Sequence, residues 1–148
     1  MKKFIIYVLF VFLCAFSGFF IYKNKLASQY EETAVPYIKQ VLPIISTWDP
    51  TLVRNYMAPE VIDRVSDVDL KNLMQSLSHM GDLQSIDKIA FRNKTSGEHT
   101  TQASLPLVTY ELTTHYSSGE VSVTISLLDK GESFDVYHFN FQSEALAK

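Results

Sequence analysis

The chain contains very little cysteine and glycine. Its 148 residues include one cysteine and five glycines. The single Cys14 lies inside an apolar run and cannot by itself form an intramolecular disulfide or a thiolate metal site. The scattered glycines form neither a Gly-rich phosphate loop nor a Gly-x-Ser-x-Gly nucleophile motif. We therefore expect a domain that is held together by packing and lacks these two catalytic motifs.

Positive charge is also scarce beyond the N-terminal region. The chain has 13 basic and 16 acidic residues, and residues 1–26 contain four lysines and no acidic residue. The remainder therefore carries nine basic against 16 acidic groups, a net charge of −7. Nucleic acids and anionic lipid surfaces are bound mainly through basic patches. We expect neither to be a partner of this acidic part of the chain.

The four histidines are too scattered to predict a metal site. No two of them lie three or four residues apart, and the only direct carboxylate neighbour is in Glu98-His99. Metal sites usually bring such ligands together at short, regular spacings. The sequence therefore predicts no metal and no cofactor. Because it also shows no acid–base pair, we expect a protein that is not an enzyme.

One long uncharged run covers residues 4–22. As a helix these 19 residues would be roughly 29 Å long, about the thickness of the hydrocarbon core of a bilayer. We predict an uncleaved membrane anchor over residues 1–25 and one domain over residues 26–148. The alternatives are a cleaved signal peptide, cut near Ala15 and Ser17, and lipidation at Cys14. Against lipidation, the bulky Leu13 stands where the processing enzyme prefers a small side chain.

The lysines around this run bear on its orientation. Two precede the run and two follow it, so the usual bias of positive charge toward the cytoplasm is nearly balanced. The three-residue tail before the run also carries the terminal amine, which would have to cross the membrane in the opposite orientation. We predict a single-pass protein with its N terminus in the cytoplasm and its C-terminal domain outside it.

Apolar residues at spacings of three and four predict an amphipathic helix over residues 26–48. Pro36 and Pro43 would each remove one of its hydrogen bonds. We predict a kinked continuation of the anchor, with a fresh helix start at Pro36 as the alternative.

Two further helices are predicted before the pattern changes. Asp49-Pro50 is a helix start signal, and the helix that it opens is expected to run to about Met57. Another helix is expected to be capped at Ser66 or Asp67 and to end at Gly81.

From residue 83 onward the apolar residues follow a period of two. We predict strands at about residues 83–94, 103–116, 121–127 and 134–141, and a polar loop over residues 93–101. The third strand alternates valine, isoleucine and leucine with serine and threonine, as a strand with one face in water does. Helices followed by four such strands predict an α+β fold, in which helices pack on a curved four-stranded antiparallel sheet.

Three segments carry a resemblance to a known superfamily: TWDPTLVRNYMAPEVIDRV, LSHMGDLQSIDKIAF and VTYELTTHYSSGEVSVTISLLDKGESFDVYHFNFQSEAL. They resemble small membrane-anchored bacterial proteins of the NTF2-like (cystatin-like) superfamily, with a Trp-Asp helix corner, a Leu-x-x-x-Gly-x-Leu helix end and a closing aromatic strand. The resemblance covers about residues 26–146. It implies an NTF2-like domain on the periplasmic side of the bacterial inner membrane, with no assigned activity.

The resemblance also implies a cone whose sheet concavity can hold a small ligand. The residues that would form such a pocket are Trp48, Tyr110, Tyr116, His138 and Phe139. His138 lies between two aromatic residues on a strand and is a candidate to point inward. Its simplest interpretation is a core or edge histidine that is satisfied by one hydrogen bond.

Two hypotheses about function remain. The first is a non-enzymatic, membrane-tethered exported domain that acts as a protein-interaction or assembly module, through strand addition at a sheet edge or charge pairing with a partner or a second copy. The second is binding of a small apolar, lipid-derived ligand in the sheet concavity, which requires an open cavity lined by Tyr110, Tyr116 or Phe139. A VirB8-like subunit of a type IV secretion system is a remote alternative, because its longer cytoplasmic tail and Asn-Pro-x-Gly motif are missing here.

Overall fold

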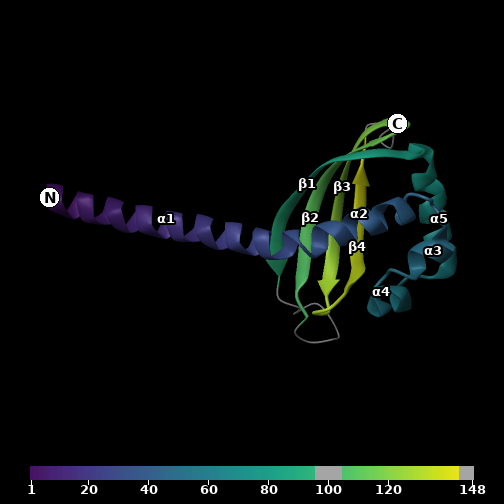
Figure 1. Ribbon diagram of the computed structural model, residues 1–148, viewed down its shortest axis with the longest axis horizontal. Coiled ribbons are helices and arrows are strands. Elements are labelled where there is room, and N and C mark those ends of the chain that lie inside the picture. Colours follow the sequence, from purple (N-terminus) through teal and green to yellow (C-terminus); the bar gives the residue numbers. More distant parts are fainter. Residues whose placement is uncertain (96–104, 144–148) are drawn as a thin grey trace. The chain divides into compact units, whose positions relative to one another are not determined.

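The computed structural model describes residues 1–95 and 105–143 of the chain (Figure 1). It divides into two compact units, Met1–Val35 and Pro36–Lys148. The first unit consists of helix α1, Lys2–Glu31, and the start of the next helix. The second holds the remaining helices and a four-stranded antiparallel sheet. The protein is therefore an α+β protein with a long apolar N-terminal helix, as the sequence predicts.

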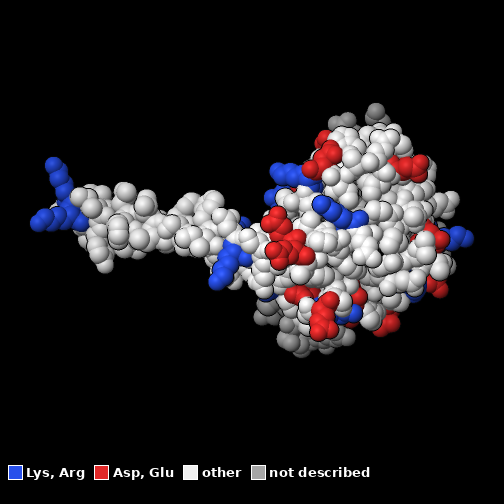
Figure 2. Space-filling view, viewed as in Figure 1, with Lys and Arg blue, Asp and Glu red and all other residues white. Residues whose placement is uncertain are grey.

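Helix α1 is long and apolar enough to cross a membrane, a property that signal sequences near an N terminus share. Its side chains over residues 4–22 are exposed, and Figure 2 shows an uncharged stretch of this helix between lysines at its two ends. Within the run, the hydroxyl of Ser17 donates a hydrogen bond of 3.0 Å to the carbonyl oxygen of Cys14. A polar side chain is thus satisfied inside an apolar helix.

A two-residue turn separates α1 from helix α2, Ala34–Ile45. Residues 32 and 33 form a turn, in which the N–H of Thr33 bonds the carbonyl oxygen of Tyr30 at 3.2 Å. The helix is therefore interrupted just before Pro36, and α2 begins at Ala34 rather than at Pro36. Pro36 falls in the first turn of α2, where backbone N–H groups have no intrahelical acceptor, so it is tolerated there.

Two of the three shorter helices begin at the predicted caps. The three are α3, Pro50–Arg54, α4, Pro59–Arg64, and α5, Asp67–Leu77, and the 3₁₀ turn η1, Ser78–Met80, follows them. The carboxylate of Asp49 accepts a hydrogen bond of 2.9 Å from the N–H of Thr51 at the start of α3. The hydroxyl of Ser66 accepts one of 3.1 Å from the N–H of Asp69 at the start of α5. Both caps satisfy backbone N–H groups that have no partner within the helix.

The stretch between these two caps differs from the prediction. Helix α3 ends at Arg54 rather than near Met57, and α4 is an additional helix. Helix α4 opens on Pro59, whose restricted backbone suits the first helical position. The same proline therefore starts a helix, although from the sequence it signalled only the end of the preceding one.

The four strands form a meander in the order β1-β2-β3-β4, as predicted. Their bounds are β1, Leu83–Thr95, β2, Leu107–Tyr116, β3, Gly119–Asp129, and β4, Phe134–Gln142. The predicted start of the second strand at Ala103 and most of the predicted loop, from residue 96 to 101, lie outside the described residues. Strand β1 is one edge of the sheet and β4 is the other.

The hydrophobic core lies between α2 and the inner face of the sheet, which curves around this helix (Figure 1). Four α2 side chains on one helix face are 0% exposed, namely Ile38, Val41, Leu42 and Ile45. Every second residue of β2 is buried against them, and β3 alternates in the same way from Val121 to Leu127. The predicted period of two therefore places the apolar side chains of both strands in one core.

Candidate functional site

The structure separates the five residues that the sequence placed in a pocket. Tyr110 and Tyr116 are core residues, 2% and 1% exposed. Trp48 and Phe139 are half-buried, and His138 is exposed. The two tyrosines therefore pack within the core and do not line an open cavity.

His138 does not point inward, because a β-bulge changes the alternation of β4. Ser126 pairs with His138 while Leu127 pairs with Val136, so Tyr137 is an extra residue in the strand. Simple alternation from the buried Val136 would bring His138 to the inner face. The bulge instead brings Phe139 to that face, opposite Ile125, and leaves His138 on the outer face.

Three of the other four predicted residues meet in an aromatic cluster. The ring centroid of Trp48 lies 5.8 Å from that of Tyr116 and 5.6 Å from that of Phe141, and Phe139 lies 5.8 Å from Phe141. Tyr110 is not part of this cluster and packs edge-on against Phe91, with the centroids 5.7 Å apart. Such ring pairs stabilise a core by about 0.5–1.5 kcal/mol beyond the area that they bury.

Trp48 holds the corner between the helical layer and the sheet. Its indole N–H donates a hydrogen bond of 3.0 Å to the carbonyl oxygen of Gly81. Its backbone has a φ of 59°, in the left-handed region that a bulky residue rarely adopts. This conformation costs on the order of 1–3 kcal/mol and persists because the surrounding contacts hold it. The role of Trp48 is therefore structural.

A buried hydrogen bond joins Ser46, which follows α2, to Tyr116 at the end of β2. The two hydroxyl oxygens are 2.7 Å apart. Burial raises the pKa of Tyr116 to about 12, although the hydrogen bond with Ser46 acts in the opposite direction. This phenol therefore keeps its proton at neutral pH and does not supply a general base.

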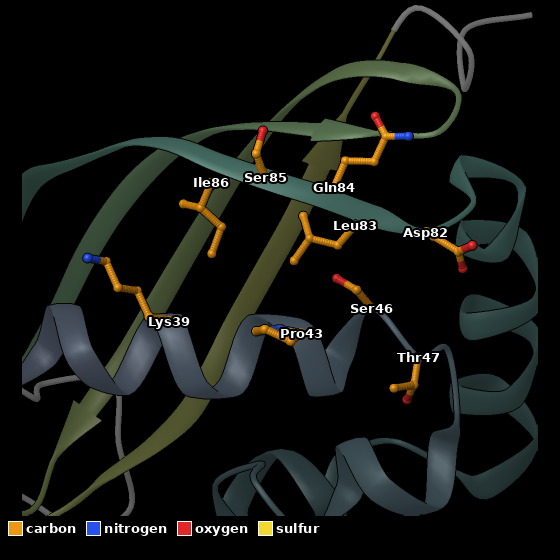
Figure 3. Close-up of a pocket in the computed structure, with 9 residues that line it drawn as sticks. All are labelled: Lys39, Pro43, Ser46, Thr47, Asp82, Leu83, Gln84, Ser85 and Ile86. Carbon is orange, nitrogen blue, oxygen red and sulfur yellow. The ribbon is translucent and has the colours of Figure 1, made fainter.

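Beside this hydrogen bond lies a groove of about 570 Å³ between α2 and β1 (Figure 3). One wall is formed by Lys39 and Pro43 of α2 with Ser46 and Thr47, and the other by residues 82–86. Sequence reasoning did not identify this groove. The only feature of the sequence that points to this place is Pro43 in the amphipathic helix. Because proline has no N–H, Pro43 cannot bond the carbonyl oxygen of Lys39 one turn earlier.

The walls of the groove differ in polarity along its length. Leu83 and Ile86 point toward α2, while Gln84 and Ser85 point away from it (Figure 3). The register explains this spacing, because Leu83 and Ile86 pair with the buried Tyr116 and Thr114, and an irregularity lies between Leu83 and Ser85. The groove therefore has an apolar floor beside the edge strand, with a charged residue at each end: Lys39 near Ile86, and Asp82 next to Leu83 (Figure 3).

Comparison with models of known protein families, with curated proteins and with solved structures finds no match for this chain. The NTF2-like resemblance therefore stays a prediction. The site has to be interpreted from its own geometry.

That geometry offers apolar, hydroxyl and charged groups that can bind a ligand. The Ser46 hydroxyl is bonded to a phenol that remains protonated, and the hydroxyl of Ser85 donates a hydrogen bond of 2.8 Å to a carboxylate oxygen of Asp87. The groove is therefore suited to binding.

A histidine with two carboxylate neighbours lies on the outer face of the sheet. The Nδ1 of His115 lies 2.6 Å from a carboxylate oxygen of Asp87, and its Nε2 lies 3.8 Å from one of Glu120. These contacts connect β1, β2 and β3 at the surface. Within residues 1–95 and 105–143, no group of three potential ligands is placed to hold a metal ion, and Glu98-His99 lies outside the described residues.

Proposed function

We propose that this protein is a non-enzymatic, membrane-tethered domain that binds other proteins. In this proposal α1 stays uncleaved as a single-pass anchor in the bacterial inner membrane, with its N terminus in the cytoplasm. The α+β domain, of the NTF2-like kind, then works on the periplasmic side as an interaction or assembly module.

The observation that carries the proposal is the exposed apolar surface of α1. Its side chains over residues 4–22 are exposed, whereas soluble proteins rarely leave a contiguous apolar patch of more than a few hundred Å² in water. The run holds 13 Phe, Ile, Leu and Val residues. At about −0.3 to −0.6 kcal/mol each near the middle of a bilayer, these favour insertion by roughly 4–8 kcal/mol.

The domain supports a binding role more than a chemical one. Its groove presents apolar and charged side chains, and β1 is an edge strand of its sheet. Binding of an apolar ligand in the sheet concavity is not favoured, because α2 fills that side and both Tyr110 and Tyr116 are buried. The fold alone does not decide between functions, so this choice rests on the site.

Chemical crosslinking of the full chain in intact bacterial membranes tests the proposal. We expect a discrete crosslinked species, either with a second protein or with another copy of the chain. A control in which the domain is fused to an unrelated single-pass anchor should give the same species, because the domain makes the contact. Recovery of the monomer alone, at crosslinker levels that trap a known membrane complex in the same sample, would refute the proposal.

A further inference from the structure

The two edges of the sheet are not equally open. Part of the β4 edge is covered, since the N–H of Ala58 bonds the carbonyl oxygen of Val136 at 2.8 Å and the N–H of Val136 bonds that of Tyr56 at 2.7 Å. Among the described residues, no backbone hydrogen bond joins the outer edge of β1 to another element. Strand β1 therefore presents unpaired backbone groups beside the groove.

From these features we infer that an extended peptide segment of a partner protein, apolar with acidic residues, binds along the open edge of β1 and places side chains in the groove between α2 and β1. This inference rests on the proposed function and specifies the surface through which the domain binds its partner. A helix beside an edge strand is the geometry in which strand addition gives affinity through the main chain and specificity through alternate side chains.

The register of β1 limits the length of the peptide. Irregularities lie between Leu83 and Ser85, between Ile86 and Lys88, and between Phe91 and Asn93. The longest regular stretch is residues 88–91, so we expect main-chain pairing over about four residues. Bulges on an edge strand oppose indefinite pairing between copies of a chain.

The charges beside this edge select an acidic segment. Lys39 on α2 and Lys88 on β1 are both exposed, and neither forms an ion pair with the residues that the structure describes. These two free ammonium groups can pair with carboxylates of a partner. Asp82 stands at the other end of the groove and is exposed, so we expect the acidic residues of the peptide to lie at the Lys39 end.

The backbone of α2 adds a further binding group. Because Pro43 has no N–H, the carbonyl oxygen of Lys39 has no α-helical donor, and both residues line the groove. An N–H group of a bound peptide can satisfy this acceptor. Apolar side chains of the same peptide would pack on Pro43, Leu83 and Ile86.

A peptide selection tests the inference directly. The full chain in lipid nanodiscs would be screened against a random ten-residue peptide library displayed on phage. We expect the enriched peptides to be apolar and β-branched with at least one acidic residue. Lys39→Glu should weaken binding of a synthetic peptide from this selection at least ten-fold. Lys71→Glu makes the same charge change at an exposed site on α5 and should leave binding within two-fold.

Amide hydrogen exchange on the full chain locates the bound peptide. With the peptide added, amides of residues 88–91 should become protected, and methylation of alternate peptide nitrogens should abolish both binding and protection.

Absence of enrichment, equal effects of the two lysine variants, or protection on β4 alone would overturn the inference. Concentration-dependent protection of β1 in the chain alone would also overturn it, by showing that a second copy occupies the edge. If membrane crosslinking recovers a partner that Lys39→Glu does not release, the inference fails while the proposed function stands.

Discussion

The hydrogen bond between Ser46 and Tyr116 gives the sharpest stability prediction. Its oxygens are 2.7 Å apart, and the two residues are 7% and 1% exposed. We consider Ser46→Ala, Tyr116→Phe and the double variant. Each single change removes one partner of a bond that links the end of α2 to the sheet.

The two single variants should differ because their leftover groups differ. Ser46→Ala leaves the hydroxyl of Tyr116 buried without its partner and should lower the free energy of unfolding by about 1–3 kcal/mol. Tyr116→Phe leaves the Ser46 hydroxyl on the groove wall, within reach of water, and should cost about 0.5–1.5 kcal/mol. The double variant should be only slightly less stable than Ser46→Ala, with a coupling energy near 1 kcal/mol.

The burial of Tyr116 predicts an alkaline transition. The pKa of Tyr116 is raised from 10.0 to about 12 in the folded protein, so the unfolded chain loses its proton first as the pH rises. The stabilisation is therefore complete below pH 10 and is lost between pH 10 and 12, by about 2–3 kcal/mol. Tyr37, whose pKa burial also raises to about 12, adds to this loss. The alkaline loss should be smaller in Tyr116→Phe than in the wild-type chain.

Urea unfolding of the full chain in detergent micelles can measure these values. Trp48 is the single tryptophan, and its ring lies 5.8 Å from that of Tyr116, so its fluorescence reports this region. Ser126→Ala is a control, because it removes a similar hydrogen bond, 2.9 Å from Thr109, at a part-buried site, and should cost less than 1 kcal/mol. Strictly additive effects of the two changes at Ser46 and Tyr116 would refute the reasoning.

Three further predictions concern other parts of the chain. Gly81→Ala should lower the free energy of unfolding by more than about 2 kcal/mol in thermal melts, because Gly81 has a φ of 80° and a Cβ there would overlap the Ser117 hydroxyl. Gly119→Ala is the control: Gly119 has a φ of 134° with open space around it, so this change should cost less. His115→Gln should change the free energy of unfolding by about 0–1 kcal/mol at pH 6, since both of its carboxylate contacts are exposed, and a larger loss in urea titrations would contradict this view. Cys14→Ala should leave membrane association unchanged in a fractionation assay, whereas release of the protein would indicate that lipidation at this residue provides the attachment.

Patterns local in sequence predicted most of the fold. The period of two across Val121, Val123 and Ile125 identified a strand and its buried face, and the caps at Asp49 and Ser66 located helix starts. These signals succeed because side-chain alternation and capping involve residues only two or three positions apart.

The candidate site was less accessible from the sequence because it depends on contacts between distant segments. The orientation of His138 depends on a bulge in the pairing of β4 with β3, and the residues of β4 alone do not predict that bulge. The groove brings Lys39 and Pro43 against residues 82–86, about 40 positions further along the chain. Tyr110 and Tyr116 looked like pocket residues because they are aromatic and share a strand face, and that face turned out to be the core.

Membrane tethering of the domain requires that α1 remain part of the mature protein. Intact-mass measurement of the protein purified from bacterial membranes decides this question. A mass that includes residues 1–22 without a lipid modification is the predicted result. A mass that begins after Ala15 or Ser17, or that carries a lipid on an N-terminal Cys14, would contradict the proposed transmembrane anchor.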